Sequence, residues 1–285
     1  MTSTRDPATH SRPRVGHIDF LNCLPLYDGL VRSGGLLDVR LVRDTPDKLS
    51  NLLIAGGLDL GPISLVPALQ NAEDLLVLPD LAVGSDGAVL SVVLVSKEPP
   101  EQVTGTVALG STSRTSVLLA QMLMEQRWGN RPTYETMAPD LASMLRACDA
   151  AVLIGDTALR ATYDAPGRGL YVTDLGAAWR EWTGLPMVFA VWAARRDYAE
   201  AYPERVAEVQ HSFRTSLTSS LARVEEVAED AARWEPFDAA TLVTYFRALD
   251  FRLGVRQIEG LTEFARRAAL QGAVPPDVRL SFAAV

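Results

Sequence analysis

The chain has 285 residues, a length typical of about two domains and sufficient to form an apolar core without disulfides or metal. Hydrophobic residues make up 48% and charged residues 22%, so the composition is globular and disfavours disordered and fibrous classes. The net charge of −8 disfavours a nucleic-acid or anionic-membrane binder, although a few local donors suffice to hold a small anion.

After a polar N-terminal tail, strand and helix patterns alternate. Strands are predicted over residues 14–20, 37–43 and 58–63, and helices over 26–33, from Pro46 to Gly56–Gly57, and over 65–71. Ser64 is placed to cap the last of these helices. This alternation is typical of an α/β domain with a largely parallel sheet.

Two continuous apolar runs, residues 91–96 and 188–193, each lead directly into a charged segment. Between them lies a self-contained block with predicted strands over 106–109, 133–136 and 150–154 and helices over 116–127 and 141–148. This order fits a second lobe inserted between two strands that cross between lobes. Residues 58–64 resemble residues 148–156, which favours two related lobes; the alternative is that α/β proteins commonly reuse this unit.

Beyond Tyr198 the chain is predicted to be helical, with a long stretch over 199–233, broken once or twice, and further helices over 239–249 and 257–271. We therefore expect a discontinuous first lobe of residues 1–96 and 191–285, which includes these C-terminal helices. Residues 97–190 form the predicted second lobe.

The cysteines and histidines do not form a recognisable site. Cys23 and Cys148 lie far apart and are predicted to be buried, reduced thiols. His10, His17 and His211 lack a metal-binding spacing, so we expect no metal and no cofactor. The N-terminus lacks the apolar core of a secretory signal, and no apolar run is long enough to span a bilayer. We expect a cytoplasmic protein without membrane or nucleic-acid partners; nothing in the sequence specifies an oligomeric state.

The most informative segment for chemistry is residues 109–116, which ends a strand and starts a helix. It offers backbone N–H groups, the cation Arg114 and the hydroxyls of Ser111, Thr112, Ser113 and Thr115. A helix N-terminus of this composition suits a carboxylate or phosphate, although the spacing differs from that of a nucleotide-binding P-loop. The alternative is a well-capped helix start without a ligand.

Other polar positions are expected at the carboxyl ends of strands, where ligands collect in open α/β sheets. Asn22 follows the first strand and is either a cleft amide or a turn residue. Ser91 begins the first apolar run and either faces the cleft or binds a backbone group. Ser64 and Gly155–Asp156 occupy matching positions in the two lobes and are alternatively bare helix caps. Residues 179–187 form a predicted loop with two tryptophans, either a cleft wall or core.

The sequence contains no dinucleotide-binding fingerprint, no nucleophile elbow and no apparent Ser-His-Asp set. Because histidines are few, catalysis would depend on positioning and polar donors more than on a strong protein base. The residues alone therefore predict a two-lobed α/β protein that binds a small anion.

Five motifs, in the same order along the chain, resemble those of chorismate dehydratases, which catalyse the first step of the futalosine route to menaquinone. They are residues 15–26, 87–96, 111–116, 151–156 and 181–186. The resemblance covers residues 14–270 and implies a type II periplasmic-binding-protein-like fold with two crossing strands between the lobes. The related dihydroxynaphthoate synthases share this fold, but residues 20–25 do not resemble their opening motif.

The resemblance implies conversion of dianionic chorismate to 3-[(1-carboxyvinyl)oxy]benzoate and water. It assigns Asn22 and Ser91 to catalysis, where they orient the ring and bind the departing oxygen or the side-chain carboxylate. Ser111, Thr112, Ser113 and Arg114 are expected to grip a carboxylate. Ser64, Gly155 and Asp156 are further expected substrate contacts.

The base that removes the C3 proton is left open by the sequence. Asp156 and Glu181 are candidates, and the scarcity of bases favours the substrate's own enolpyruvyl carboxylate. The alternative functions are a small-anion binding or sensor protein of the same fold, or a dihydroxynaphthoate synthase.

Overall fold

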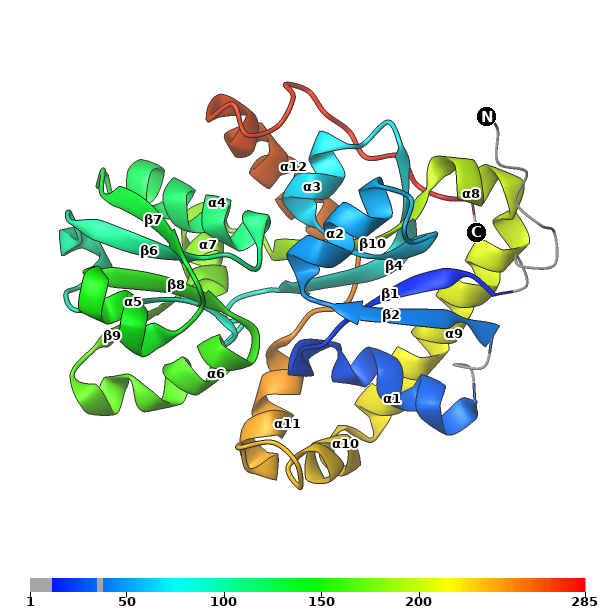
Figure 1. The fold of residues 1–285 in the computed structure, drawn as a ribbon, viewed down its shortest axis with the longest axis horizontal. Helices are drawn as coiled ribbons and strands as arrows, with labels where there is room; N and C mark the ends of the chain where they lie inside the picture. The colour runs from blue at the N-terminus through cyan, green and yellow to red at the C-terminus, as the bar shows by residue number, and fades with distance from the viewer. Residues whose placement is uncertain (1–11, 35–37, 285) are drawn as a thin grey trace.

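A computed structural model describes residues 12–34 and 38–284, which form two lobes side by side (Figure 1). The first eleven residues of the polar N-terminal tail and the start of the strand predicted over residues 37–43 lie outside the described residues. Each lobe is built on a five-stranded sheet with helices on its faces, which confirms the α/β class.

The first sheet has the strand order β2-β1-β3-β10-β4. Its strands are β1 (Arg14–Ile18), β2 (Arg40–Asp44), β3 (Leu60–Ser64), β4 (Leu75–Ser85) and β10 (Met187–Arg195). Its helices are α1 (Leu24–Ser33), α2 (Pro46–Ile54) and α3 (Leu65–Gln70). Pro46 occupies the first turn of α2, where a missing N–H costs nothing, and Gly34 ends α1 in the left-handed conformation.

The second sheet has the order β7-β6-β8-β5-β9. Its strands are β5 (Val92–Ser96), β6 (Thr106–Gly110), β7 (Thr133–Met137), β8 (Ala150–Ile154) and β9 (Tyr171–Asp174). Its helices are α4 (Arg114–Met122), which continues as a π-helical segment (Leu123–Arg127), α5 (Leu141–Ala147), α6 (Gly155–Asp164) and α7 (Leu175–Thr183). Short 3₁₀ turns are η2 (Leu21–Cys23), η4 (Pro100–Gln102) and η6 (Pro166–Arg168).

The two sheets have equivalent topologies, which gives a structural meaning to the similarity between residues 58–64 and 148–156. These segments contain β3 and β8, the central strands of their sheets. The two apolar runs are also equivalent: β10 pairs antiparallel with β3 and β4, and β5 pairs antiparallel with β8 and β9. The sheets are therefore mixed rather than wholly parallel.

The chain passes between the lobes twice, over residues 86–91 and 184–186. The sequence analysis placed residues 91–96 in the first lobe, but β5 pairs only with strands of the second sheet. β10 belongs entirely to the first sheet, including the residues before 191. Each apolar run is thus the strand that follows a crossing rather than the crossing itself.

Two arginines hold the crossings together at Asp86. Arg180 of α7 forms an ion pair with Asp86 at 2.7 Å, and it also donates to the Gly184 carbonyl. Arg256 of the C-terminal region forms a second ion pair with Asp86 at 3.4 Å and donates to the same carbonyl at 3.3 Å. The first and second crossings are therefore joined by two side chains that share their acceptors.

The C-terminal helices are α8 (Arg196–Ala201), α9 (Pro203–Ala222), α10 (Val224–Ala231), α11 (Ala239–Ala248) and α12 (Val255–Leu270). The predicted long helix is broken at Tyr202 and Arg223, in agreement with the expectation of one or two breaks. α9 packs along α1, and α12 packs against β10 and α4. α11 lies beneath the junction of the two lobes (Figure 1).

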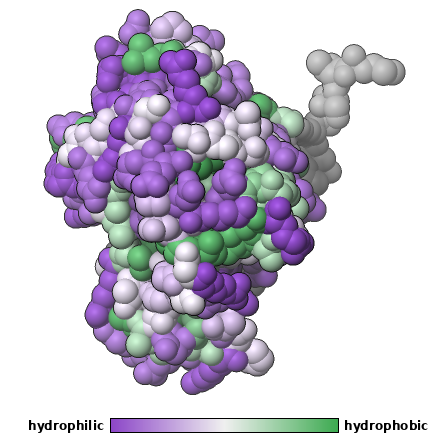
Figure 2. Space-filling model, turned by 90° about the vertical axis from the view of Figure 1, so that its left-hand side faces the viewer, coloured by the Kyte–Doolittle hydropathy of each residue, from purple (hydrophilic) through white to green (hydrophobic). Residues whose placement is uncertain are grey.

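A large apolar core extends from the first lobe into the second, and a smaller one lies on the other face of the second sheet. β5 joins them: Val92 and Leu94 point into the large core, whereas Val93 and Val95 point into the small one. This alternation follows from the two-residue period of a strand. The end of the molecule that faces the viewer in Figure 2 is largely hydrophilic, with a band of hydrophobic surface across it. Among the described residues, none of the helices combines the length and apolar character needed to cross a membrane.

Candidate functional site

The carboxyl ends of β1, β3, β6 and β8 meet where the two lobes touch, and hydrogen bonds bridge the lobes directly. The Leu21 N–H donates to Asp156 Oδ1 at 3.0 Å, and the Val66 N–H donates to Thr115 Oγ1 at 3.0 Å. Such bonds require the lobes to be in contact, so the structure represents a closed arrangement of the cleft.

Asn22 lies in η2, directly after β1, as the sequence analysis predicted. Its Oδ1 atom is buried and has no hydrogen-bond partner among the residues that the structure describes. Buried polar atoms are nearly always paired, because an unpaired one has lost its hydration without compensation. The Asn22 amide is therefore suited to meet a polar group supplied by a ligand.

Ser91 is 1% exposed at the start of β5 and lies beside the first turn of α6. Its carbonyl accepts the Gly155 N–H at 2.8 Å, and its own Oγ approaches the Val89 carbonyl at 3.4 Å, a long contact. The Ser91 side chain lies close to the hydroxyl of Tyr245 on α11 and, as a hydrogen-bonding neighbour, lowers the pKa of Tyr245 against the dominant effect of burial. This contact lies outside hydrogen-bond geometry, so the Tyr245 hydroxyl has no hydrogen-bond partner among the described residues.

The crossing that precedes Ser91 is held in a strained conformation. Leu90 has φ of +62°, in the left-handed region that non-glycine residues rarely occupy. Asp174 accepts the N–H groups of Val89 at 3.0 Å and Leu90 at 2.7 Å, and with its other oxygen it caps α7 by accepting the Ala177 N–H at 2.9 Å. One carboxylate thus fixes both the crossing and the helix.

Asp156 is in the first turn of α6, where it accepts the Leu21 N–H. Burial raises its pKa to about 6, and the negative charges of Glu235 and Asp19 add to the increase, whereas the bond from Leu21 opposes it. Gly155 before it has φ of +66°, and the ring of Phe20 lies about 3.0 Å from the position that a Cβ atom would occupy. A side chain at Gly155 would push the two lobes apart.

The segment 111–114 ends β6 and starts α4, as predicted. Ser111 is exposed and Thr112 is half-buried, while Ser113 caps α4 by accepting the Ser116 N–H at 3.3 Å. Arg114 is bound to the other lobe: its Nε donates to Asp47 Oδ1 at 2.7 Å.

The Nη2 atom of Arg114 donates to Asn51 Oδ1 at 2.6 Å. The guanidinium therefore already has partners on α2, and its predicted grip on a substrate carboxylate remains a prediction. Ser64 is buried at the start of α3 in the predicted cap position, but its side chain forms no capping bond to the helix.

The sequence did not indicate two of the groups near the site, and it did not indicate the contacts of two others. Tyr245 and Glu235 come from the C-terminal helical region, and Thr115 contacts the opposite lobe through its hydroxyl. Cys23 is buried close enough to Asp156 that the carboxylate adds to the burial that raises the thiol pKa. Cys23 and Thr115 lie within the motifs over residues 15–26 and 111–116, but no motif marks Tyr245 or Glu235, which only the packing of the C-terminal helices brings to the cleft.

The structure separates two other candidates from this cluster. Glu181 is exposed on α7, where it forms an ion pair with Arg127 at 2.7 Å. Trp179 lies in the core, in edge contact with Trp182, and both belong to helix α7 rather than to a loop. Cys23 and Cys148 are both buried and unpaired, as predicted. Within the described ranges, 12–34 and 38–284, no three His, Cys, Asp or Glu residues are grouped to hold a metal ion.

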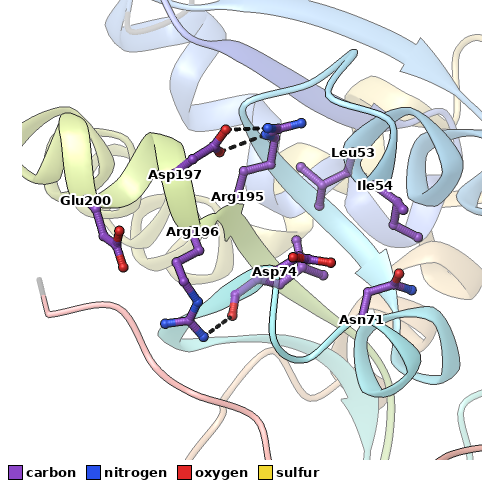
Figure 3. A pocket seen from close by; sticks show the side chains of 9 residues that line it. Leu53, Ile54, Asn71, Asp74, Arg195, Arg196, Asp197 and Glu200 are labelled. Carbon is purple, nitrogen blue, oxygen red and sulfur yellow. Dashed lines mark hydrogen bonds and ion pairs between the residues drawn. The ribbon is translucent and has the colours of Figure 1, made fainter.

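A separate pocket of about 440 Å³ opens where β10 meets α8 (Figure 3). It is lined by Leu53, Ile54, Asn71, Asp74, Leu75, Arg195, Arg196, Asp197 and Glu200. Its arginines are engaged within the protein. Arg195 pairs with Asp197 (Figure 3). Arg196 donates to the Glu73 carbonyl at 2.6 Å and to the Leu75 carbonyl at 3.5 Å. The pocket contains none of the predicted site residues.

Comparisons with known proteins agree with this fold. A family model described as menaquinone biosynthesis matches residues 13–270. The chorismate dehydratase of Thermus thermophilus is 33% identical over 273 residues, covering 91% of this chain and 96% of that protein. The chorismate dehydratase of Campylobacter jejuni is 30% identical over 179 residues, covering 61% of this chain and 64% of that protein.

Solved structures with low sequence identity share the fold. A protein of Archaeoglobus fulgidus, 19% identical, superposes with a TM-score of 0.72 and covers 93% of this chain and 99% of that chain. The periplasmic aliphatic sulphonate binding protein of Escherichia coli, 17% identical, gives a TM-score of 0.65 with coverages of 94% and 90%. The fold is therefore that of the periplasmic-binding-protein-like proteins, as the sequence motifs implied.

Proposed function

The chain belongs to the menaquinone biosynthesis family, and from that membership we propose that it is a chorismate dehydratase. In this proposal the enzyme is a carbon–oxygen lyase that converts chorismate to 3-[(1-carboxyvinyl)oxy]benzoate and water. The observation that carries the proposal is the convergence of Asn22, Ser91 and Asp156 from both lobes, within a chain whose similarity to a chorismate dehydratase spans both lobes.

The reaction removes a hydroxyl group from C4 and a proton from C3, and the ring becomes aromatic. Aromatisation provides the thermodynamic driving force, so the protein's task is to hold a dianion in one geometry and to assist the departure of hydroxide. Orientation of this kind contributes several kcal/mol, roughly 7 or more in well-aligned cases. The closed lobes support this role because they bury the polar groups that would contact the substrate.

We assign the Asn22 amide and the Ser91 hydroxyl to the reacting part of the ring and to the departing oxygen. Both groups lie at the lobe contact, and the Asn22 Oδ1 atom has no partner of its own within the described residues. The N-terminus of α4, with Ser111, Thr112 and Ser113, and the groups at Ser64 and Gly155 supply further donors toward the carboxylates.

Removal of the C3 proton is assigned to the substrate's own enolpyruvyl carboxylate, which acts as the base. Asp156 has a pKa of about 6 before any ligand binds, and a neighbouring dianion raises the pKa of a carboxyl group further. Asp156 is then neutral in the complex and donates a hydrogen bond, so it cannot accept the C3 proton. In this scheme the substrate carboxylate takes the C3 proton and hydroxide leaves C4. The carboxyl group then gives the proton to the hydroxide, which forms water and restores the carboxylate.

The proposal is tested by adding chorismate to the purified protein and following the ring protons by NMR. New aromatic signals together with retained enolpyruvyl signals are expected. Unchanged chorismate with tight binding would instead show a binding or sensor protein of the same fold.

We also propose that the enzyme acts in the cytoplasm. The support is chemical: Cys23 and Cys148 are buried and unpaired, as expected of a protein from a reducing compartment.

A further inference from the structure

Tyr245 on α11 combines complete burial with an unpaired hydroxyl. Its side chain is 0% exposed, and its Oη atom has no hydrogen-bond partner in the described part of the chain. Buried tyrosine hydroxyls normally find a partner, because burial without one costs the hydration energy of the group. The arrangement is therefore unfavourable for the ligand-free protein unless another molecule supplies the missing partner.

The surroundings of this hydroxyl locate it at the contact between the lobes. Ser91 lies next to it, and the charges of Asp156 and Cys23, were they ionised, would both raise the pKa of Tyr245. Asp156 belongs to the second lobe and Ser91 directly precedes its strand β5, whereas Tyr245 and Cys23 belong to the first lobe. The Tyr245 hydroxyl thus faces the same cluster as Asn22, whose Oδ1 atom is the other unpaired buried atom there.

We propose that the Tyr245 hydroxyl donates a hydrogen bond to a carboxylate oxygen of the bound substrate, which makes α11 part of the substrate site. This inference rests on the proposed dehydratase function and adds a substrate-binding residue from outside the recognised motifs. A carboxylate is the favoured partner because a buried anion needs donors, and bonds to ionised acceptors are the stronger ones.

The protonation state of Tyr245 agrees with the role of a donor. Burial raises the pKa of the phenol well above its usual value, and this effect outweighs the opposing influence of Ser91. The hydroxyl therefore keeps its proton at neutral pH and acts neither as a base nor as a proton donor in the chemical step. Its contribution is to substrate binding and orientation.

The test compares Tyr245→Phe with Tyr27→Phe. Tyr27 is the matched control because it is also buried, but its hydroxyl already donates to the Gly16 carbonyl at 2.9 Å. For Tyr245→Phe we expect kcat/KM for chorismate to fall about tenfold to a hundredfold, the range for one bond to a charged group, with a Tm equal to or above that of the wild type. For Tyr27→Phe we expect a lower Tm and an unchanged kcat/KM.

Two results would overturn the inference: a kcat/KM of Tyr245→Phe within twofold of the wild type, or a Tm reduced as much as in Tyr27→Phe. The second would show that the hydroxyl has a partner inside the protein. If wild-type protein does not turn over chorismate, the dehydratase proposal fails separately, and the Tm increase caused by chorismate is compared instead. A smaller increase in Tyr245→Phe then supports the inference, and an equal increase, or none in either protein, refutes it.

Discussion

Asp156 of the second lobe accepts a hydrogen bond from the Leu21 N–H of the first lobe, at 3.0 Å and directly beside Asn22. The bond joins the loop after β1 to the first turn of α6, so closure of the lobes and the state of the Asp156 carboxyl are linked. Because burial raises the pKa of the Asp156 carboxyl to about 6, the hydrogen bond between the lobes is sensitive to pH near neutrality.

Substrate affinity should fall as pH rises through 6 to 8. The neutral Asp156 binds a dianion better than the ionised form does, and the ionised form becomes dominant above the pKa of about 6. Isothermal titration with chorismate across this range is expected to show weaker binding at higher pH and proton uptake on binding. Asp156→Asn, which resembles the neutral acid, should bind with little pH dependence. A loss of kcat of a hundredfold or more with unchanged affinity would instead identify Asp156 as the base.

The same carboxyl should make the free protein less stable as pH rises from about 4 to 6. The folded pKa of Asp156 lies above the value of 3.8 for an unperturbed aspartate, so unfolding releases a proton in this window and becomes easier as pH increases. Between pH 4 and pH 6, the difference in unfolding free energy between wild type and Asp156→Asn should change by at most about 3 kcal/mol, at 1.36 kcal/mol per pKa unit. Urea titrations of both proteins at pH 4 and pH 7.5 measure this change. An unchanged difference would contradict the raised pKa.

Asn22→Ala should reduce turnover without a matching loss of stability. The Asn22 Oδ1 atom has no partner inside the described protein, so its removal breaks no bond of that atom, whereas a lost contact in the transition state costs about a hundredfold in kcat. Asn130→Ala is the matched control, because the buried Asn130 amide donates to the Pro100 carbonyl at 2.8 Å, away from the cleft. It should lower Tm and leave kcat unchanged. Equal kcat values for Asn22→Ala and wild type would remove Asn22 from the mechanism.

Asp174→Ala should lower both stability and activity, because Asp174 holds the left-handed Leu90 that precedes Ser91. Loss of the acceptor for several N–H groups is expected to cost about 2–4 kcal/mol in the free energy of unfolding. Asp140→Ala is the control: Asp140 also caps a helix, α5, by accepting the Ser143 N–H at 2.8 Å, but it holds no crossing. It should cost about 1 kcal/mol and leave kcat unchanged. Full kcat in folded Asp174→Ala would show that Ser91 is positioned without it.

Asp47→Ala should raise KM, Arg114→Ala should raise it at least as much, and the double variant should raise it no further than Arg114→Ala. Arg114 Nε is bonded to Asp47 across the cleft, so both changes remove this lobe contact, and Arg114→Ala also removes the bond to Asn51. Glu208→Ala, which removes an exposed ion pair with Arg205 within α9, should leave KM unchanged. A much larger effect of Arg114→Ala than of a combined Asp47→Ala and Asn51→Ala variant would instead support direct contact between Arg114 and a substrate carboxylate.

The sequence was informative wherever local pattern and structure coincide. The buried run of β8, the Pro46 start of α2 and the breaks near Tyr202 and Arg223 each follow from residues that act within a few positions. β4 was not predicted, because Pro79 and the left-handed Asp80 interrupt its alternation, and only pairing with β10 makes it one strand.

The site was predictable in part for the same reason. Three site residues lie next to strands and within motifs that can be seen in the sequence: Asn22, Ser91 and Asp156. Tyr245 reaches them through the path of the C-terminal helices, which no local pattern encodes. The partners of Arg114 on α2 were likewise hidden, since they lie about 65 positions earlier in the chain and meet it only when the lobes close.

The double passage between the lobes, cross-linked at Asp86 and Gly184, restricts how the cleft can open. Two short crossing segments that are fixed side by side let the lobes bend relative to each other but resist twisting of one lobe against the other. β5 and β10 pair with neighbouring strands immediately after the two crossings, so each crossing is fixed where it enters a sheet. We therefore expect opening to move Ser91 away from Asn22 by bending at the two crossings. Each closure should then bring the same polar groups back into the same arrangement.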